Sequence, residues 1–250
     1  MSFMVPDWPL PPGVRAAQTT RSGGVSGAPY ASMNLATHVG DDPAHVQTNR
    51  QRLHAALALP GEPLWLEQVH GIAVHLAAHE NMPTHAPRAD AAYTDQPGMV
   101  LAVLTADCLP VLFASRDGQE IAAAHAGWRG LLGGVLEASL SHFRALPADI
   151  IAWLGPAISQ AAFEVGDEVR TAFMQHDLAA YSAFVPSPQS EHRAGHWQAD
   201  LYSLARQRLA ACGLQNVYGG ELCSYSDSVN FYSYRREPTT GRMASLIWRA

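Results

Sequence analysis

The sequence predicts a single α/β domain in which much of the sheet is antiparallel. Three apolar runs follow one another with only short turns between them: Met99 to Thr105, Leu109 to Ser115 and Glu120 to Ala124. Apolar runs bounded by Gly, Pro and Asp are typical of strands that are buried on both faces. Because consecutive strands joined by short turns favour antiparallel pairing, this three-strand meander forms the centre of the predicted fold.

The composition is that of an ordinary globular protein with one core. Of its 250 residues, 48% are hydrophobic and 15% are charged, and no composition shift marks a second domain. The net charge of −6 and the lack of a basic run argue against a nucleic-acid partner. No apolar stretch reaches the roughly 18 residues that a membrane helix needs, so no membrane association is expected.

The cysteine and lysine counts restrict the location and the chemistry. Cys108, Cys212 and Cys223 are too few and too odd in number for a disulfide framework, which favours a reducing compartment, by default the cytoplasm. All sixteen basic residues are arginines. This excludes a lysine Schiff base and a phosphate-binding loop that ends in G-K-[ST]. Any bound anion must therefore be held by arginine or by backbone amides.

The chain begins with segments that are expected to lie outside the sheet. Residues 1–13 are rich in proline and are predicted to form a flexible arm before a domain of residues 14–250. A loop rich in Gly and Ser then ends at Asn34. A helix is predicted to follow, with Asp42 as its N-cap and Pro43 as its first residue.

A strand is predicted before the meander, in the sequence P-L-W-L-E-Q-V-H-G that ends with His70 and a turn glycine. Leucines at helical spacing after the meander predict a covering helix over residues 130–146. The segment from Ser187 to His196 is polar and is expected to be an exposed loop. The other predicted elements are a strand at 150–154, helices at about 167–176 and 200–212, and strands at 217–222, 231–234 and 244–248.

Polar side chains stand where the predicted buried strands end. Cys108 lies at the bend between the first two strands of the meander, and His125 follows the third. His70 closes the upstream strand. Two imidazoles and one thiolate form the open ligand set of a catalytic zinc site, in which the fourth position is left for water. The spacing alone also allows Cys108 and His125 to be buried structural residues.

Three further charged residues lie beside these strand ends. Arg129 lies at the start of a predicted helix, where it is expected either to bind an anion or to pair with a carboxylate of the sheet. Glu164 precedes another helix, where an acid suits the helix dipole, and it could equally act as a general base. Asp107 immediately precedes Cys108.

Six motifs, in this order along the chain, resemble those of the laccase-domain, or YfiH-like, family. They are Q-V-H-G, A-D-C-L-P-V, A-H-A-G-W-R-G, L-G-P-A-I, F-E-V-G-D-E-V and F-Y-S-Y-R-R-E-P-T-T-G-R-M-A-S-L-I-W. The resemblance runs from about Thr20 to Trp248. That family was first described as multicopper polyphenol oxidases and is now understood as zinc-dependent purine nucleoside phosphorylases that also deaminate adenosine.

The resemblance implies a catalytic domain over residues 14–250, built as a layered sandwich of mixed sheets with helices outside. It also implies that His70, Cys108 and His125 are the metal ligands. Segments that line the family's pocket correspond here to Arg21, Ser22, Asn34 and Asp90. Together with the charged residues at the strand ends, the candidate substrate contacts are Arg21, Asn34, Asp107, Arg129 and Glu164.

The function that the resemblance implies is that of a zinc-dependent purine nucleoside phosphorylase with adenosine deaminase and methylthioadenosine phosphorylase activity. Its partners are then a small nucleoside and phosphate, and the sequence does not indicate whether it has protein partners. The residues leave two alternatives open. One is a copper-dependent polyphenol oxidase, because two histidines and one cysteine are also a copper ligand set, although no H-x-H pair supports further copper sites. The other is a cysteine hydrolase in which His125 or His70 activates Cys108 and Asp107 or Glu164 orients the histidine.

Overall fold

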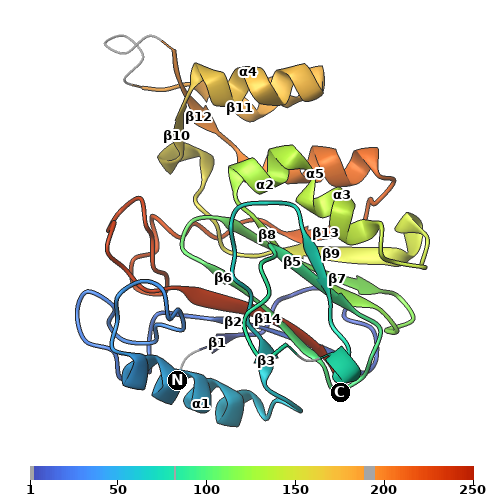
Figure 1. Cartoon of the computed structure of the whole chain (residues 1–250). Coiled ribbons are helices and arrows are strands. Elements are labelled where there is room, and N and C mark those ends of the chain that lie inside the picture. The colour runs from blue at the N-terminus through green and yellow to red at the C-terminus, as the bar shows by residue number, and fades with distance from the viewer. Residues whose placement is uncertain (1–2, 82, 189–194) are drawn as a thin grey trace.

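The computed structural model describes residues 3–81, 83–188 and 195–250 and arranges them in three sheets with helices on the outside (Figure 1). A five-stranded sheet has the spatial order β1 (Phe3–Met4), β2 (Val14–Thr19), β14 (Met243–Arg249), β6 (Val100–Thr105) and β3 (Pro63–Leu64). A six-stranded sheet has the order β13 (Val217–Gly219), β9 (Ile150–Leu154), β7 (Leu109–Ser115), β8 (Ile121–Ala126), β5 (Ala91–Thr94) and β4 (Val74–Leu76). A small third sheet has the order β10 (Glu164–Gly166), β12 (His196–Ala199) and β11 (Phe184–Pro186).

Most neighbouring strands in these sheets are antiparallel, among them β6 with β14, β5 with β8, and β7 with both β8 and β9. The three-strand meander expected from the sequence is only partly correct, because β7 and β8 pair with each other whereas β6 lies in the other large sheet. An apolar run indicates that a strand is buried but not which strand is its hydrogen-bonded neighbour. Three pairs are parallel, namely β3 with β6, β4 with β5, and β9 with β13. The predicted α/β domain of mixed, largely antiparallel sheets with outer helices is therefore confirmed.

The two large sheets pack face to face, and strand β6 shows how the sequence allows this. Its residues Leu101 and Val103 point into the core between the sheets, where they meet Leu112 of β7. The alternate residues Val100 and Ala102 point to the opposite face and pack in a second core. Because successive side chains of a strand point to opposite faces, a strand covered on both sides must be apolar throughout.

Helices cover the outer faces of this pair of sheets. Helix α1 (Pro43–Leu57) packs on the five-stranded sheet (Figure 1). The six-stranded sheet is covered by α2 (Trp128–Gly133), α3 (Val135–Leu140) and α5 (Leu201–Ala211). The small sheet and α4 (Asp167–His176) lie beyond α2 and α5, at the upper end of the view. The short 3-10 helices are His79–Asn81, Pro147–Asp149, Gln160–Ala162 and Leu178–Ala183.

Helix α1 begins as its sequence predicts. The side chain of Asp42 accepts a hydrogen bond from the backbone N–H of Ala44, and Pro43 occupies the first turn. Helix α5 begins in the same way, since Asp200 accepts hydrogen bonds from the backbone N–H groups of Tyr202 and Ser203. These caps satisfy backbone donors that a helix start leaves unpaired.

The helix predicted over residues 130–146 is instead two short helices, α2 (Trp128–Gly133) and α3 (Val135–Leu140). The break falls at Gly134, whose φ of 104° is in the left-handed region. Its N–H donates to the carbonyl groups of Gly130 and Leu131, so Gly134 ends the first helix as a glycine commonly does. The leucine periodicity is right about the buried face but does not reveal this break.

The predicted strand over residues 231–234 is wrong. Phe231 and Tyr232 are fully buried, but they lie in an irregular loop. The carbonyl of Phe231 accepts a hydrogen bond from Arg236, and the N–H of Tyr232 faces the sulfur of Met243. An apolar run indicates burial, and here the backbone partners are side chains and not a neighbouring strand. The strand predicted before His70 is likewise reduced to Pro63–Leu64.

The N-terminal segment differs from the flexible arm expected over residues 1–13. Phe3–Met4 pairs with the end of β2, and Trp8 is only 7% exposed in the core between the sheets. Burial of this indole explains why a proline-rich segment is held against the domain. Of the loop expected at 187–196, residues 189–194 lie outside the described residues.

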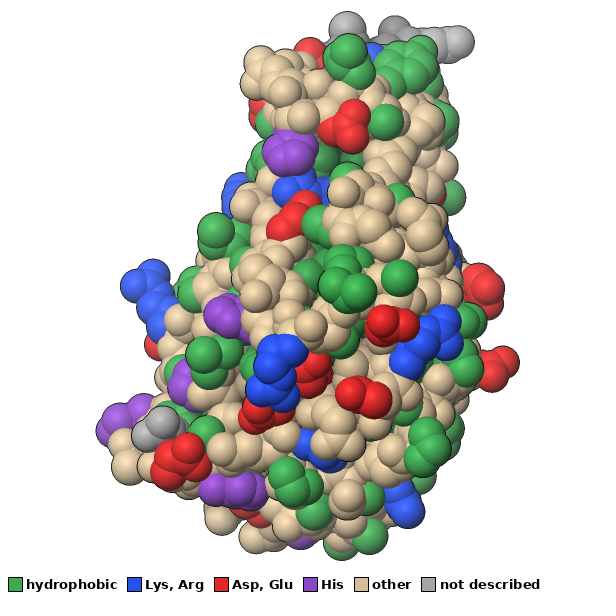
Figure 2. Space-filling model, turned by 90° about the vertical axis from the view of Figure 1, so that its right-hand side faces the viewer, with side chains coloured by type: hydrophobic (Ala, Val, Ile, Leu, Met, Phe, Trp, Pro, Cys, Tyr) green, Lys and Arg blue, Asp and Glu red, His purple; other side chains and the backbone are tan. Residues whose placement is uncertain are grey.

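None of the helices in the described residues is both long and apolar enough to span a bilayer. On the face shown in Figure 2, basic side chains lie next to acidic ones and do not form a continuous basic surface. This distribution agrees with the net charge of −6.

The central position of Phe113 on β7 leads to a stability prediction. This side chain is 0% exposed and lies 6.4 Å, centroid to centroid, from the ring of Phe143. Phe113→Ala is expected to lower the free energy of unfolding by about 3–5 kcal/mol, because it removes buried apolar area and leaves a cavity. Denaturant titration measures this change. Leu146→Ala, at a side chain that is 68% exposed, is the control and should cost less than about 1 kcal/mol; equal losses would contradict the assigned core.

Candidate metal centre

His70, Cys108 and His125 come together at one end of the two large sheets. One potential ligand atom from each lies within 4.8 Å of the others. The Cys108 sulfur is 3.7 Å from Nε2 of His70, and the two imidazole rings meet edge to face with centroids 4.8 Å apart. His125 is buried, Cys108 is half-buried and His70 is exposed. The protein therefore covers the cluster at His125 and leaves it accessible to solvent at His70.

Two of the three residues are placed by adjacent strands. Cys108 immediately precedes β7, and His125 is the penultimate residue of β8, in register with Pro110. Antiparallel pairing therefore brings the start of one strand beside the end of the next. Only a glycine fits at position 127, because a Cβ there would lie 2.8 Å from His70 Cδ2 and 2.9 Å from the Cys108 sulfur.

The third residue, His70, is placed by the carboxylate of Asp90. This fully buried carboxylate accepts hydrogen bonds from the backbone N–H groups of Val69, His70 and Gly71, at 3.1, 2.8 and 2.7 Å. They hold His70 at a φ of 60°, a left-handed conformation that is uncommon for a residue other than glycine.

The same carboxylate orients His125. Its Oδ1 lies 2.8 Å from Nδ1 of His125, so Nδ1 is engaged as the donor and Nε2 is the ring nitrogen left for a metal ion. Burial raises the pKa of the Asp90 carboxyl, but the hydrogen bonds from His125 and the backbone outweigh it and hold that pKa below its usual value. One ionised side chain thus positions two of the three potential ligands.

Cys108 and His125 shift each other's pKa values toward their charged forms. Burial raises the pKa of the Cys108 thiol, but the charges and hydrogen bonds of His125 and His70 lower it by more. Burial lowers the pKa of His125, whereas the Cys108 thiolate and Asp90 raise it by more. Cys108 is therefore a thiolate at neutral pH, which is the form that binds metal ions.

The three residues line one part of a cavity of about 430 Å³. Its apolar walls include Trp128, Ile158, Phe163 and Leu201. Its polar side chains, apart from the three potential metal ligands, are those of His38, Gln68, Thr105, Asp107, Arg129, Tyr234, Arg235 and Arg242. A cavity of this size with aromatic walls and a few polar groups is typical of a small-molecule site.

Arg129 and Asp107 are the candidate substrate contacts that line the cavity. The exposed guanidinium of Arg129 stacks on the ring of Trp128 at 4.3 Å. The Asp107 carboxylate binds protein groups with both oxygens, because it accepts hydrogen bonds from Ser224, Ser233 and the backbone N–H of Arg235. In the position expected for the residue that orients a histidine, the structure has Asp90 and not Asp107 or Glu164.

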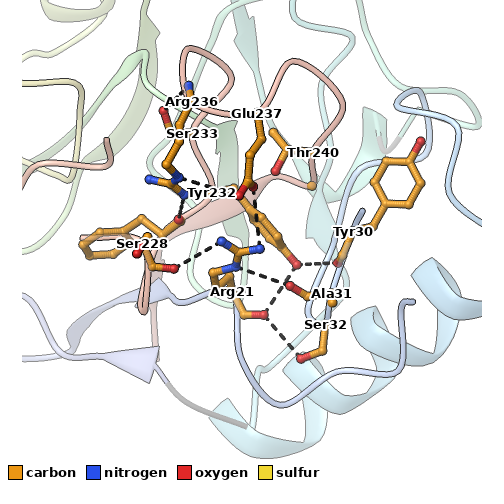
Figure 3. A network of polar contacts seen from close by, with 12 residues as sticks. Arg21, Tyr30, Ala31, Ser32, Ser228, Tyr232, Ser233, Arg236, Glu237 and Thr240 are labelled. Atoms are coloured by element: carbon orange, nitrogen blue, oxygen red, sulfur yellow. Dashed lines mark hydrogen bonds and ion pairs between the residues drawn. The ribbon is translucent and has the colours of Figure 1, made fainter. Parts of the chain in front are cut away.

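The remaining candidates do not line the cavity. Arg21 forms hydrogen bonds with the carbonyl groups of Ala31 and Ser228 and an ion pair with Glu237, within the polar network of Figure 3. Its neighbour Ser22 also lies outside the cavity lining.

Asn34 and Glu164 lie just behind the cavity walls. Asn34 is fully buried, and its Oδ1 accepts a hydrogen bond from the backbone N–H of Arg242. Glu164 accepts a hydrogen bond from Ser187, and its carbonyl accepts two from Arg235. Each residue therefore supports an arginine of the cavity wall, Asn34 through the backbone of Arg242 and Glu164 through the guanidinium of Arg235.

The sequence analysis did not select several residues of the cavity wall. Gln68, Trp128 and Arg242 lie within the motifs that carry the family resemblance, and this is the signal that could have identified them. His38 lies in no such motif. Proximity to the metal centre, which only the folded chain shows, is what distinguishes these residues.

The fold and the site together define a mixed-sheet α/β protein with a potential His₂Cys metal centre in a small-molecule cavity. The chain belongs to the laccase-like family described as multi-copper polyphenol oxidoreductase laccase, whose sequence profile matches residues 15–250. It is 55% identical over 246 residues to the purine nucleoside phosphorylase YfiH of Escherichia coli, covering 98% of both chains. It is 46% identical over 248 residues to a purine nucleoside phosphorylase of Haemophilus influenzae, covering 99% of both chains.

Solved structures with the same fold are also similar to this chain. A Neisseria meningitidis protein of family DUF152 has a TM-score of 0.93 and 46% identity, with 100% of this chain and 99% of that chain covered. YlmD from Geobacillus stearothermophilus has a TM-score of 0.82 and 34% identity, with coverage of 95% and 92%. The predicted family is therefore confirmed.

The role of Asp90 in orienting the site leads to a prediction. Asp90→Asn is expected to weaken zinc binding by about tenfold to a hundredfold, because a neutral amide cannot hold both the His70 backbone and the His125 ring as the carboxylate does. Competition with a chromogenic chelator measures this affinity. Glu120→Gln is the matched control, since Glu120 is similarly buried and accepts backbone hydrogen bonds from Arg144 and Ala145. Weakening by the control alone would refute the role of Asp90.

Replacement of the thiol provides a direct test of the ligand set. Cys108→Ser is expected to abolish tight zinc binding, because a neutral hydroxyl is a far poorer ligand than a thiolate. Cys212→Ala and Cys223→Ala, which lie outside the three-residue cluster, should keep the zinc of the unaltered protein. Metal analysis after dialysis gives the stoichiometry. Retention of a full equivalent by Cys108→Ser, or its loss from Cys223→Ala, would show that the wrong thiol is assigned.

Proposed function

We propose that this protein is a zinc-dependent purine nucleoside phosphorylase that also phosphorolyses methylthioadenosine and deaminates adenosine. The observation that carries the proposal is the His70, Cys108 and His125 cluster within a cavity that has both aromatic walls and arginines. Relatives named purine nucleoside phosphorylase, with nearly full coverage, support it. The free cysteines support a location in the reducing cytoplasm.

The donor set fits zinc. Two imidazoles and one thiolate are ligands of catalytic zinc sites, and here the Asp90 contact leaves Nε2 of His125 as the ring nitrogen available to a metal. His70, Cys108 and His125 would hold the ion. When bound, zinc supplies Lewis-acid chemistry that activates water near neutral pH, which deamination of a purine ring requires.

The rest of the cavity suits a nucleoside and an anion. The rings of Trp128 and Phe163 provide apolar surface on which a purine base can pack. Phosphorolysis forms a bond from a phosphate oxygen to the sugar C1′ and breaks the bond from that carbon to the purine nitrogen. Arginine side chains in the wall favour the phosphate through charge-assisted hydrogen bonds.

A cysteine hydrolase is the second candidate, and one observation favours it. The Cys108 thiolate, the His125 imidazole and the Asp90 carboxylate form a nucleophile, base and orienting group of the kind that such enzymes use. A copper oxidase has less support, because no second group of three potential metal ligands occurs among the described residues. Metal content therefore separates the three functions.

Metal removal and phosphate dependence test the proposed function together. Protein with one equivalent of zinc should convert inosine and methylthioadenosine to free base only when phosphate is present, and should deaminate adenosine without it. Removal of the metal with a chelator should abolish all three reactions, and zinc should restore them. Chromatography of the products measures each reaction. Undiminished activity without metal, with sensitivity to cysteine alkylation, would instead support the hydrolase.

A further inference from the structure

Arg242 lines the cavity that contains the metal centre, and the fold fixes its position. It immediately precedes β14, and its backbone N–H donates a 3.0 Å hydrogen bond to Asn34. Its Nη1 donates hydrogen bonds of 3.0 Å to the carbonyl groups of Thr240 and Gly241. The guanidinium is therefore held through Nη1 alone, by the two residues that precede Arg242 in the chain.

The charge of Arg242 has no counter-ion in contact with it. Over the parts of the chain that the structure describes, no carboxylate lies within 4.0 Å of this guanidinium, and Nε and Nη2 have no hydrogen-bond acceptor. Two other half-buried arginines have a carboxylate partner, since Arg208 contacts Glu137 at 2.5 Å and Arg170 lies 3.8 Å from Asp167. Apart from two carbonyl groups, the guanidinium contacts the ring of Tyr234, whose centroid is 5.8 Å from Cζ. A half-buried cation without a counter-ion is costly, and a bound anion would relieve that cost.

The negative groups nearest to Arg242 are already engaged. Burial lowers the pKa of Arg242, while the charges of Cys108 and Asp107 raise it. Both oxygens of Asp107 accept hydrogen bonds from protein groups. A metal ion held by Cys108 would neutralise the charge of the thiolate.

His38 lines the same cavity and adds a hydrogen-bond donor. Burial and the positive charges of Arg242 and Arg50 lower its pKa, so its ring is neutral at pH 7. A neutral imidazole donates one hydrogen bond and accepts another. The two remaining donor nitrogens of a guanidinium match two oxygens of a tetrahedral oxyanion.

The other arginines of the cavity are less suited to hold an anion. Arg235 donates both of its Nη groups to the carbonyl of Glu164. Arg129 is exposed to solvent, so water already solvates its charge. Arg242 is the half-buried guanidinium of this wall with two uncommitted nitrogens within the described chain.

We propose that Arg242, with His38 beside it, forms an oxyanion subsite that binds inorganic phosphate next to the metal centre. The proposal rests on the proposed function in that phosphate is the second substrate of phosphorolysis. It assigns the phosphate to Arg242 and not to Arg129, for which the sequence left anion binding as one of two alternatives.

Two variants test this subsite, and phosphate itself is the probe. Arg242→Gln should raise both the Kd for phosphate, measured by calorimetry on zinc-loaded and metal-free protein, and the KM for phosphate in inosine phosphorolysis. The expected change is about tenfold to a hundredfold, the scale of a lost charge-assisted hydrogen-bond pair. Arg242→Lys keeps the charge but not the fork, so its loss should be smaller. The KM for inosine should change much less than that for phosphate.

Arg170→Gln is the matched control, because it removes the same charge from a half-buried guanidinium that stacks on Trp197, away from the cavity. It should leave the Kd for phosphate unchanged. Melting temperatures verify folding, and Arg242→Lys alone carries the test if Arg242→Gln does not fold.

Three results would overturn the subsite: no phosphate binding by the unaltered protein, unchanged phosphate Kd in the folded Arg242 variants, or a loss that follows Arg129→Ala instead. A different result would overturn the proposed function but not the subsite. In that case the unaltered protein binds phosphate, the Arg242 variants lose it, and no nucleoside is phosphorolysed. The calorimetric and kinetic measurements therefore separate the two proposals.

Discussion

The candidate site depends on a single buried carboxylate, that of Asp90. It accepts hydrogen bonds from three consecutive backbone N–H groups of the His70 turn and bonds the ring of His125. An unpaired buried carboxylate is strongly destabilising, so the turn and the strand must come together when the chain folds. Because Asp90 immediately precedes β5, which pairs with β8, the same sheet that buries the carboxylate also brings His125 to it.

A second carboxylate, Asp107, connects the C-terminal segment to the centre. Asp107 has a φ of 89°, in the left-handed region, and lies directly before Cys108. Hydrogen bonds from Ser224, Ser233 and the backbone of Arg235 reach it from the loop that precedes β14. This loop supplies one wall of the cavity. The two aspartates therefore have different roles. One positions the potential metal ligands, and the other attaches the wall that carries the arginines.

The sequence motifs were informative about the potential metal ligands and much less informative about the substrate contacts. The types of metal donor could be predicted from the sequence, because a cysteine and histidines at strand ends have a definite metal chemistry. The substrate contacts could not be predicted as well. Arg21 and Asn34 lie in a loop next to the site, yet each is engaged in hydrogen bonds that support the fold. Arg242 differs from them, since its guanidinium lines the cavity and has no carboxylate partner among the described residues.

The sequence by itself determined the three buried central strands, the capped start of α1 and the residue types of the three potential ligands. Continuous apolar runs, Asp42 as an N-cap, and donor chemistry are local properties that need no knowledge of distant residues. Only the tertiary structure decided that residues 231–234 are a buried loop, that the covering helix breaks at Gly134, and that His38 and Arg242 share a cavity with the metal centre. The physical reason is that burial, counter-ions and hydrogen-bond partners are set by segments far apart in the chain, which come into contact only when the sheets pack.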